Sequence, residues 1–169
     1  LKRYLTLPAP DRPGAAEELA QLESRLDAAY STGKFAHQGK TLTLNDAEAR
    51  QLSGEHNVVK AARAILRMGP RAVVVKRGEY GAAFFSGEEV FIASAFPLPA
   101  VFDPTGAGDS FAGGFMGYLA KRGSEERGVL RRAIVLGSVL ASFVVEQFSL
   151  DRLRTLTPAE IHARYGEAK

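Results

Sequence analysis

The sequence predicts a layered α/β domain, and three features of the chain carry this prediction. From Thr43 onward, segments with helical spacing of apolar residues alternate with short runs rich in β-branched or aromatic residues. The run RAVVVKRG, residues 71–78, has the continuous apolar character of a buried strand. The segment at residues 127–148 is apolar on nearly all sides in its middle, so we expect a buried helix. Such alternation is typical of a sheet covered by helices.

Residues 1–41 precede this pattern and are expected to form a separate N-terminal helical segment of uncertain origin. Prolines at positions 8, 10 and 13 are followed by the stretch AAEELAQLESRLDAAY, residues 15–30. One apolar stripe with spacings of three and four residues runs along this stretch, made of Leu19, Leu22, Leu26 and Tyr30. The polar stretch STGKFAHQGKT, residues 31–41, ends the helix with glycines.

Two helices and a hairpin are expected in the middle of the chain. NDAEARQLSG, residues 45–54, begins with an asparagine N-cap and an acidic first turn and ends at a glycine. VVKAARAILRMG, residues 58–69, is a second amphipathic helix. After the strand at 71–78, GAAFFSGEEVFIASAF is expected to form a β-hairpin that turns near Ser86 and Gly87.

Three further elements complete the expected order. LPAVFD, residues 98–103, is expected to be another short strand. A long helix is expected from about Asp109 to Lys121, ahead of the buried helix described above. TPAEIHARY is expected to be a short helix with Thr157 as its cap and Pro158 at its first position.

Composition places the chain among globular proteins and argues against several classes of function. The length of 169 residues suits one domain, and 46% hydrophobic with 24% charged residues is ordinary. No cysteine is present, so we expect no disulfide and a cytoplasmic, reducing location. No apolar run approaches the roughly 18 residues that cross a bilayer. The formal net charge of +3 comes from basic residues interleaved with acidic ones. We therefore expect neither membrane nor nucleic-acid binding.

The stretch DPTGAGD, residues 103–109, places glycines and carboxylates where a helix is expected to begin. Gly106 and Gly108 permit unusual backbone angles, and the N–H groups of the turn and of the first helical turn can converge on one point. Such a point suits phosphoryl oxygens or a developing negative charge. Asp109 beside it can act as a general base toward a hydroxyl. Alternatively, Asp109 is only a helix cap and the glycines form only a tight turn.

Four stretches in order resemble the C-terminal half of the PfkB carbohydrate kinases, the ribokinase-like sugar and nucleoside kinases. DPTGAGDSFAGGF resembles the family signature, and NDAE resembles its N-x-x-E motif. VVVKRGEYG resembles the strand and turn that border the nucleotide, and ASFVVEQF falls where the helix and loop near the adenine lie. The resemblance covers residues 42–166 and implies an incomplete ribokinase-like (Rossmann-like) α/β/α sandwich.

The resemblance also implies roles for individual residues. Asp109 matches the catalytic base that deprotonates the acceptor hydroxyl. The anion hole corresponds to Gly106, Ala107 and Gly108 together with the amide of Asp109. The remaining matched positions are Lys76, Gly78 and Gly81 on the nucleotide side, Asn45 and Glu48 in the magnesium–phosphate network, and Asp103 and Thr105 beside a monovalent cation. Glu48 is expected to act on magnesium indirectly, through water. Lys76 as a solvated strand-end lysine and Asn45 as a plain helix cap stay open as alternatives.

Other parts of the sequence depart from this family. Pro104 stands where threonine is commoner, and the loop VEQFSLDRL, residues 145–153, lacks the glycine–alanine pattern of ribokinases proper. These departures leave cation activation open. Residues 1–40, with their TLPAP stretch, are similar instead to a segment of the angiotensin-converting-enzyme-like dipeptidases. The chain has no H-E-x-x-H motif, so we expect no peptidase zinc site.

These patterns lead to one principal hypothesis about function. We expect an ATP-dependent phosphotransferase that moves the γ-phosphate to a hydroxyl of a sugar or nucleoside, with ATP and Mg²⁺, and K⁺ as a further candidate. A truncated nucleotide-binding remnant without catalysis is the alternative, since the sugar-binding half of the family pattern is not found. An idle scaffold is a third interpretation. Homodimerisation is left open.

Overall fold

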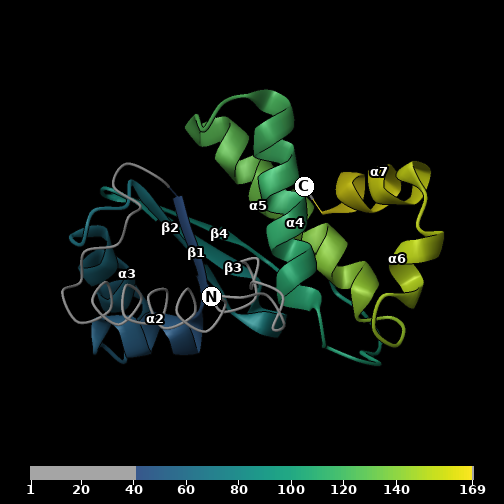
Figure 1. The fold of residues 1–169 in the computed structure, drawn as a ribbon, viewed down its shortest axis with the longest axis horizontal. Coiled ribbons are helices and arrows are strands. Elements are labelled where there is room, and N and C mark those ends of the chain that lie inside the picture. The colour runs from purple at the N-terminus through teal and green to yellow at the C-terminus, as the bar shows by residue number, and fades with distance from the viewer. Residues whose placement is uncertain (1–40, 169) are drawn as a thin grey trace, which may run out of the picture.

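The computed structural model describes residues 41–168, which form a sheet with helices on both of its faces (Figure 1). The α/β class predicted from the sequence is confirmed. The helix expected at residues 15–30 and the dipeptidase-like stretch lie outside the described residues. Within residues 41–168, no helix combines the length and the apolar character that a bilayer crossing requires.

The sheet has the strand order β1-β2-β3-β4, so strands that follow one another in sequence are neighbours in space. β1 pairs with β2 in parallel, whereas the β2–β3 and β3–β4 pairs are antiparallel. The strands are β1 (Thr41–Asn45), β2 (Ala72–Lys76), β3 (Ala82–Ser86) and β4 (Glu89–Ala93). The expected strand in RAVVVKRG and the expected hairpin turn at Ser86 and Gly87 are confirmed.

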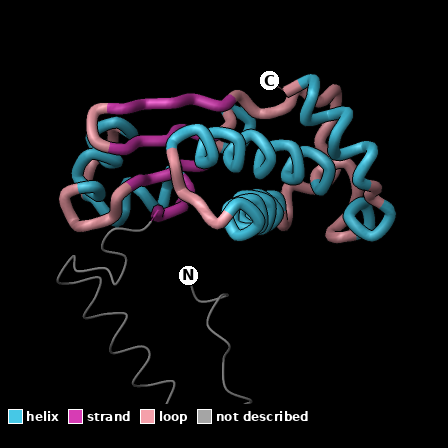
Figure 2. Tube along the Cα trace, turned by 90° about the horizontal axis from the view of Figure 1, so that it is seen from above, coloured by secondary structure: helices cyan, strands magenta, loops and turns pink. Residues whose placement is uncertain are grey.

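Two separate cores hold the helices on the two faces of the sheet (Figure 2). The covering helices are α2 (Asp46–Ser53) and α3 (Val58–Leu66) on one face, and α4 (Ala107–Arg122) and α5 (Arg127–Val144) on the other. Successive side chains of a strand point to opposite faces. Val73 and Val75 therefore enter the core under α2 and α3, whereas Val74 enters the core under α4 and α5. All three are fully buried, and β2 and β3 each have four buried residues, so these two strands form the centre of the described sheet.

Glycines let α4 and α5 approach each other closely. A Cβ atom on Gly114 of α4 would lie 2.6 Å from Leu140 Cδ1, and one on Gly137 of α5 would lie 2.8 Å from the carbonyl oxygen of Phe111. Neither position can accept a side chain without movement of its neighbour. Phe111 and Phe115 of α4 are buried against the sheet beside this contact.

A polar cluster fastens the last two helices, α6 (Asp151–Thr155) and α7 (Pro158–Glu167), to the end of α5. Arg152 contacts Glu146 at 3.1 Å and Glu160 at 2.5 Å. Arg164 of α7 contacts Glu146 at 2.5 Å and lies over the ring of Phe143, with 3.5 Å from guanidinium carbon to ring centroid. Paired in this way, the two arginines are mostly buried.

The sequence-based expectations failed at three elements. LPAVFD is not a strand: residues 94–103 have no regular structure, and Phe102 donates its N–H to the carbonyl of Val145 at 2.7 Å instead of to a strand. Pro97, Pro99 and Pro104 also remove backbone donors that a central strand needs. β1 was missed, although its TLTL alternation is a strand signal. The short helix α6 was missed because five residues give no periodicity.

The contact between α4 and α5 can be tested by adding one methyl group. Gly137→Ala should lower the free energy of unfolding by about 1–3 kcal/mol, because the new Cβ would meet a backbone oxygen that cannot rotate away. Gly117→Ala on α4 is the matched control, since nothing lies within 4 Å of its Cβ position. Better helix propensity should make that variant more stable by about 0.5–1 kcal/mol. Urea unfolding measures both changes, and equal effects would contradict this account.

The cap of α7 should give stability a defined pH dependence. The pKa of Glu160 is lowered from 4.5 to about 2 by hydrogen bonds from the Thr157 hydroxyl, the Arg152 guanidinium and the Thr157 backbone N–H. A carboxyl whose pKa falls on folding stabilises the folded chain above the unfolded value and loses that effect as the pH falls through the folded value. Thermal unfolding midpoints should therefore decline between pH 4.5 and about 2.

Glu160→Gln removes this titration, so its midpoint should be lower than wild type at pH 6 and should change less between pH 4.5 and about 2. Glu167→Gln, at the other end of the same helix, is the control and should follow the wild-type curve. A wild-type slope retained in the Glu160 variant would exclude this carboxyl as its source.

Candidate active site

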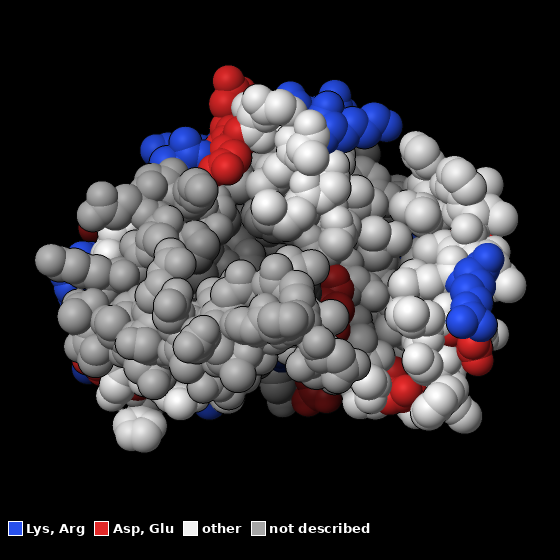
Figure 3. Space-filling view, viewed as in Figure 1, with Lys and Arg blue, Asp and Glu red and all other residues white. Residues whose placement is uncertain are grey.

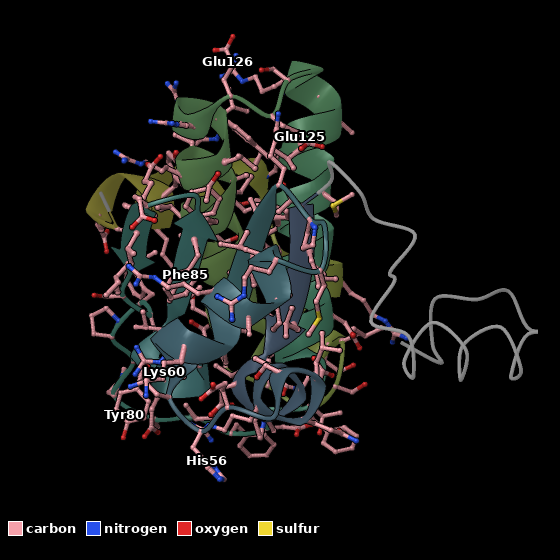
Figure 4. All side chains as sticks on the ribbon, turned by 90° about the vertical axis from the view of Figure 1, so that its left-hand side faces the viewer. His56, Lys60, Tyr80, Phe85, Glu125 and Glu126 are labelled. Carbon is pink, nitrogen blue, oxygen red and sulfur yellow. The ribbon has the colours of Figure 1, made fainter. Side chains whose placement is uncertain are left out.

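Two neighbouring parallel strands bring the first group of site residues together. Asn45 ends β1 and Lys76 ends β2, and the two residues are direct partners in the strand register. In open α/β sheets, ligands bind outside the carboxyl ends of parallel strands. In Figure 4, Tyr80 of the turn after β2 lies at one end of the molecule, and Glu125 of the α4–α5 loop lies at the opposite end. The candidate site is therefore remote from that loop.

The side chain of Lys76 reaches the glycine turn before α4. A Cβ atom built on Gly108 would lie only 3.1 Å from Lys76 Nζ. The lack of a side chain at Gly108 therefore leaves room for the Lys76 ammonium group beside this turn. Gly108 is in the first turn of α4, whose N-terminus carries a partial positive charge. Two positive groups from distant parts of the chain thus share one location, which favours a bound polyanion there.

The backbone of the turn is shaped by Gly106, which caps α4 in the left-handed region with φ 84°. The Ala107 N–H bonds to the Pro104 carbonyl at 3.2 Å, and the Ser110 N–H bonds to the Gly106 carbonyl at 2.9 Å. The amides of Gly108 and Asp109 lie between these two, in the turn where helix N–H groups point outward along the axis. The predicted anion hole therefore corresponds to the real start of a helix.

Asp109 is the third residue of α4 and is exposed. Its side chain thus belongs to the same helical turn as the amides of Gly108 and Asp109, which the sequence analysis predicts to be part of an anion hole. Gly106 supplies no capping hydrogen bond from a side chain. An approaching hydroxyl could reach an exposed carboxylate at this position without displacing the core.

Asn45 and Glu48 form a reciprocal capping box at the start of α2. The Glu48 N–H donates to Asn45 Oδ1 at 2.8 Å, and the Asn45 N–H donates to Glu48 Oε2 at 2.7 Å. The pair therefore has a structural role that the sequence interpretation had kept as an alternative for Asn45. Mg²⁺ keeps several waters and needs only one or two carboxylates beside substrate phosphates, so one carboxylate at this edge fits an indirect role.

The turn after β2 is a short 3₁₀ helix, η1 (Gly78–Tyr80), and its two predicted glycines differ in environment. A Cβ atom on Gly81 would lie 2.1 Å from the carbonyl oxygen of Ala93, so the end of β4 requires this glycine. Nothing lies within 4 Å of the corresponding position on Gly78. Packing against β4 therefore requires glycine at position 81. At Gly78, two residues after Lys76, the fold leaves free space beside the backbone.

Asp103 and Thr105 lie in the loop that leads into the glycine turn. Asp103 Oδ1 accepts the Thr105 N–H at 2.9 Å, and Oδ2 accepts the N–H of Ser149 at 3.2 Å. Hydrogen bonds from the Thr105 backbone and side chain, and then from the Ser149 backbone, lower the pKa of Asp103. Sequence reasoning missed Ser149, because no local pattern signals a bond between residues 46 positions apart.

Comparison with known proteins assigns the family. The model of the pfkB family carbohydrate kinases matches residues 32–155. Since this is most of the chain, the protein belongs to the pfkB family of carbohydrate kinases.

Individual relatives agree with this assignment. A cytidine kinase of Thermococcus kodakarensis is 40% identical over 84 residues, which are 48% of this chain and 30% of that protein. The aminoimidazole riboside kinase of Salmonella enterica, solved with its riboside and an ATP analogue, has a TM-score of 0.70 at 22% identity, over 85% of this chain and 47% of that one.

A fructokinase of Vibrio cholerae, solved with fructose, ADP and a potassium ion, has a TM-score of 0.66 at 22% identity, over 74% of this chain and 40% of that one. At this identity the two solved structures support the ribokinase-like fold alone. The chain spans less than half the length of each of these relatives, so the four-stranded sheet of residues 41–168 corresponds to only part of the solved structures.

The shared location of Lys76 and the α4 N-terminus predicts anion binding that depends on the ammonium. Lys76→Met should weaken binding of tripolyphosphate at least about tenfold, which corresponds to roughly 1.4 kcal/mol, while the free energy of unfolding stays the same or rises. Lys60→Met, on the exposed surface of α3, is the control and should bind like wild type (Figure 4). Isothermal titration calorimetry measures the affinities. An equal loss of tripolyphosphate affinity in both variants would mean that binding depends on the net charge of the chain and not on the position of Lys76.

Proposed function

We propose that residues 42–166 are the phosphate-handling part of an ATP-dependent kinase that phosphorylates a hydroxyl of a sugar or nucleoside. The observation that carries this proposal is the position of Lys76 Nζ against Gly108 in the first turn of α4. An ammonium and a helix N-terminus repel each other unless negative charge lies between or beside them. The Asp109 carboxylate in the same helical turn supplies one negative charge, a nucleotide triphosphate supplies several more, and family membership gives the chemical context.

The transfer then uses groups within one turn of helix. Asp109 accepts the proton of the attacking hydroxyl as the oxygen approaches the γ-phosphorus. The amides of Gly106, Gly108 and Asp109 stabilise the charge on the transferring group, whereas the Ala107 N–H is bonded to the Pro104 carbonyl. Lys76 neutralises phosphate oxygens from the β2 side. Mg²⁺, when bound, screens the phosphates, and Asn45 with Glu48 would hold it through water.

The acceptor is assigned only as a class. The cytidine kinase and the riboside kinase among the relatives are named for acceptors with a ribose, and the fructokinase was solved with a sugar. Each of these acceptors offers an alcohol that a carboxylate base can activate. We therefore propose a small sugar or nucleoside as substrate, and a cytoplasmic location where ATP is available.

A second candidate function is nucleotide binding without turnover. Within residues 41–168, β1 is an edge strand that pairs with β2 only, so its other edge has backbone groups without a described strand partner. The chain also spans less than half of its relatives. A phosphate site without an acceptor site would bind ATP–Mg²⁺ and transfer nothing.

One pair of measurements separates the two candidates. Calorimetry of the chain with ATP–Mg²⁺ should give binding under both of them. A coupled assay for ADP with cytidine, ribose and fructose should give acceptor-dependent turnover only for the kinase. Binding without turnover for any acceptor would support the remnant, and no binding at millimolar ATP would reject both.

The role of Asp109 makes a sharper prediction wherever turnover is observed. Asp109→Asn should lower kcat by about 10²–10⁴-fold, because the amide cannot accept the hydroxyl proton. ATP affinity should change little, since the anion-hole amides remain. Asp151→Asn, another exposed carboxylate, is the control and should keep kcat. Full activity of the Asp109 variant would reject its role as the base.

A further inference from the structure

The Asp103 carboxylate directly connects two loops that are far apart in the sequence. One loop leads into the glycine turn, and the other joins α5 to α6. Two backbone donors meet this carboxylate, the N–H of Thr105 at 2.9 Å and the N–H of Ser149 at 3.2 Å. Each places the positive end of its dipole toward a carboxylate oxygen, so together they compensate its negative charge.

The same two loops are joined a second time through the backbone. The carbonyl of Val145, just after α5, accepts the N–H of Phe102 at 2.7 Å and also that of Asp103 at 3.4 Å. Ser149 has φ 55°, the only left-handed non-glycine residue among residues 41–168. That conformation costs energy for a residue with a Cβ, and the hydrogen bond to Asp103 offsets this cost. The hydrogen bond to Asp103 therefore stabilises the backbone at Ser149 in a conformation that this residue would rarely adopt without it.

These surroundings do not fit the monovalent cation that the family resemblance implies. The Thr105 N–H occupies one acceptor position on Oδ1 and the Ser149 N–H occupies one on Oδ2, so both carboxylate oxygens already serve backbone donors and neither is given wholly to an ion. Pro104 and the loop at 145–153 depart from the family pattern at this same place.

We propose that Asp103 is a positioning residue whose bonds to Thr105 and Ser149 hold the glycine turn in its anion-binding shape, so that nucleotide binding by this chain does not depend on a monovalent cation. The inference rests on the proposed function, because it concerns the same phosphate site. Asp103 acts through the turn and touches no phosphate itself. Its neighbours supply by hydrogen bonds the charge compensation that an ion would supply.

The first test compares salts and needs no variant. ATP–Mg²⁺ affinity of the chain, measured by calorimetry at equal ionic strength in potassium chloride and in tetramethylammonium chloride, should agree within twofold. Asp103→Asn should weaken binding about tenfold in both salts, because one acceptor oxygen is replaced by a donor that faces other donors. Asp151→Asn, on the helix that follows the same loop, should bind like wild type. Tighter binding by fivefold or more in potassium would overturn the proposal.

The second test measures the hydrogen bond between the Ser149 N–H and Asp103 directly, and it does not require ATP. Amide hydrogen exchange followed by NMR should show the Ser149 N–H equally protected in both salts. Protection should be lost in Asp103→Asn and kept in Ser149→Gly, which retains the N–H and suits the left-handed backbone. Protection that appears only in potassium would overturn the proposal. If the chain binds no ATP, the proposed function fails, whereas the Ser149 amide still decides whether Asp103 connects the loops without an ion.

Discussion

The close contact between α4 and α5 is the constraint on which the rest of the described structure depends. Gly114 and Gly137 let the two helices meet nearly backbone to backbone. This fixes the start of α4 near the end of α5, where a Cβ on Gly106 would lie 3.8 Å from a methyl carbon of Val144. The glycine turn is therefore held from two sides, by the helix that it begins and by the helix that it abuts. A preorganised anion site needs this rigidity, because its amides must already point at the anion before it binds.

Several candidate site residues also stabilise the fold, and the two roles share the same atoms. The capping box of Asn45 and Glu48 starts α2, and Gly81 makes room for the end of β4. Loss of activity on changing such a residue would therefore have two possible causes. Lys76 and Asp109 differ, because neither fills a core position, and this makes their side chains the clearest reporters of chemistry at the site.

The polar cluster at the C-terminus has a consequence for the site. Arg152 and Arg164 hold α6 and α7 against Glu146, which lies in the same loop as Ser149. A mostly buried arginine is stabilised only when its charge is well paired, so this cluster has few alternative arrangements. On the face shown in Figure 3, the basic and acidic side chains of the described residues lie in small separate groups.

The sequence by itself determined the elements whose signals are local. Residues within a single turn or strand predict several elements: the β-branched run of β2, the hairpin, the caps at Asn45 and Thr157, and the glycine turn. The glycine turn also carries the motif that identifies the family. Only the tertiary structure placed Lys76 against Gly108 and joined Asp103 to Ser149, since both depend on how α4 and α5 pack on the sheet. It also decided that LPAVFD is not a strand, because a strand exists only where a neighbour accepts and donates its backbone hydrogen bonds.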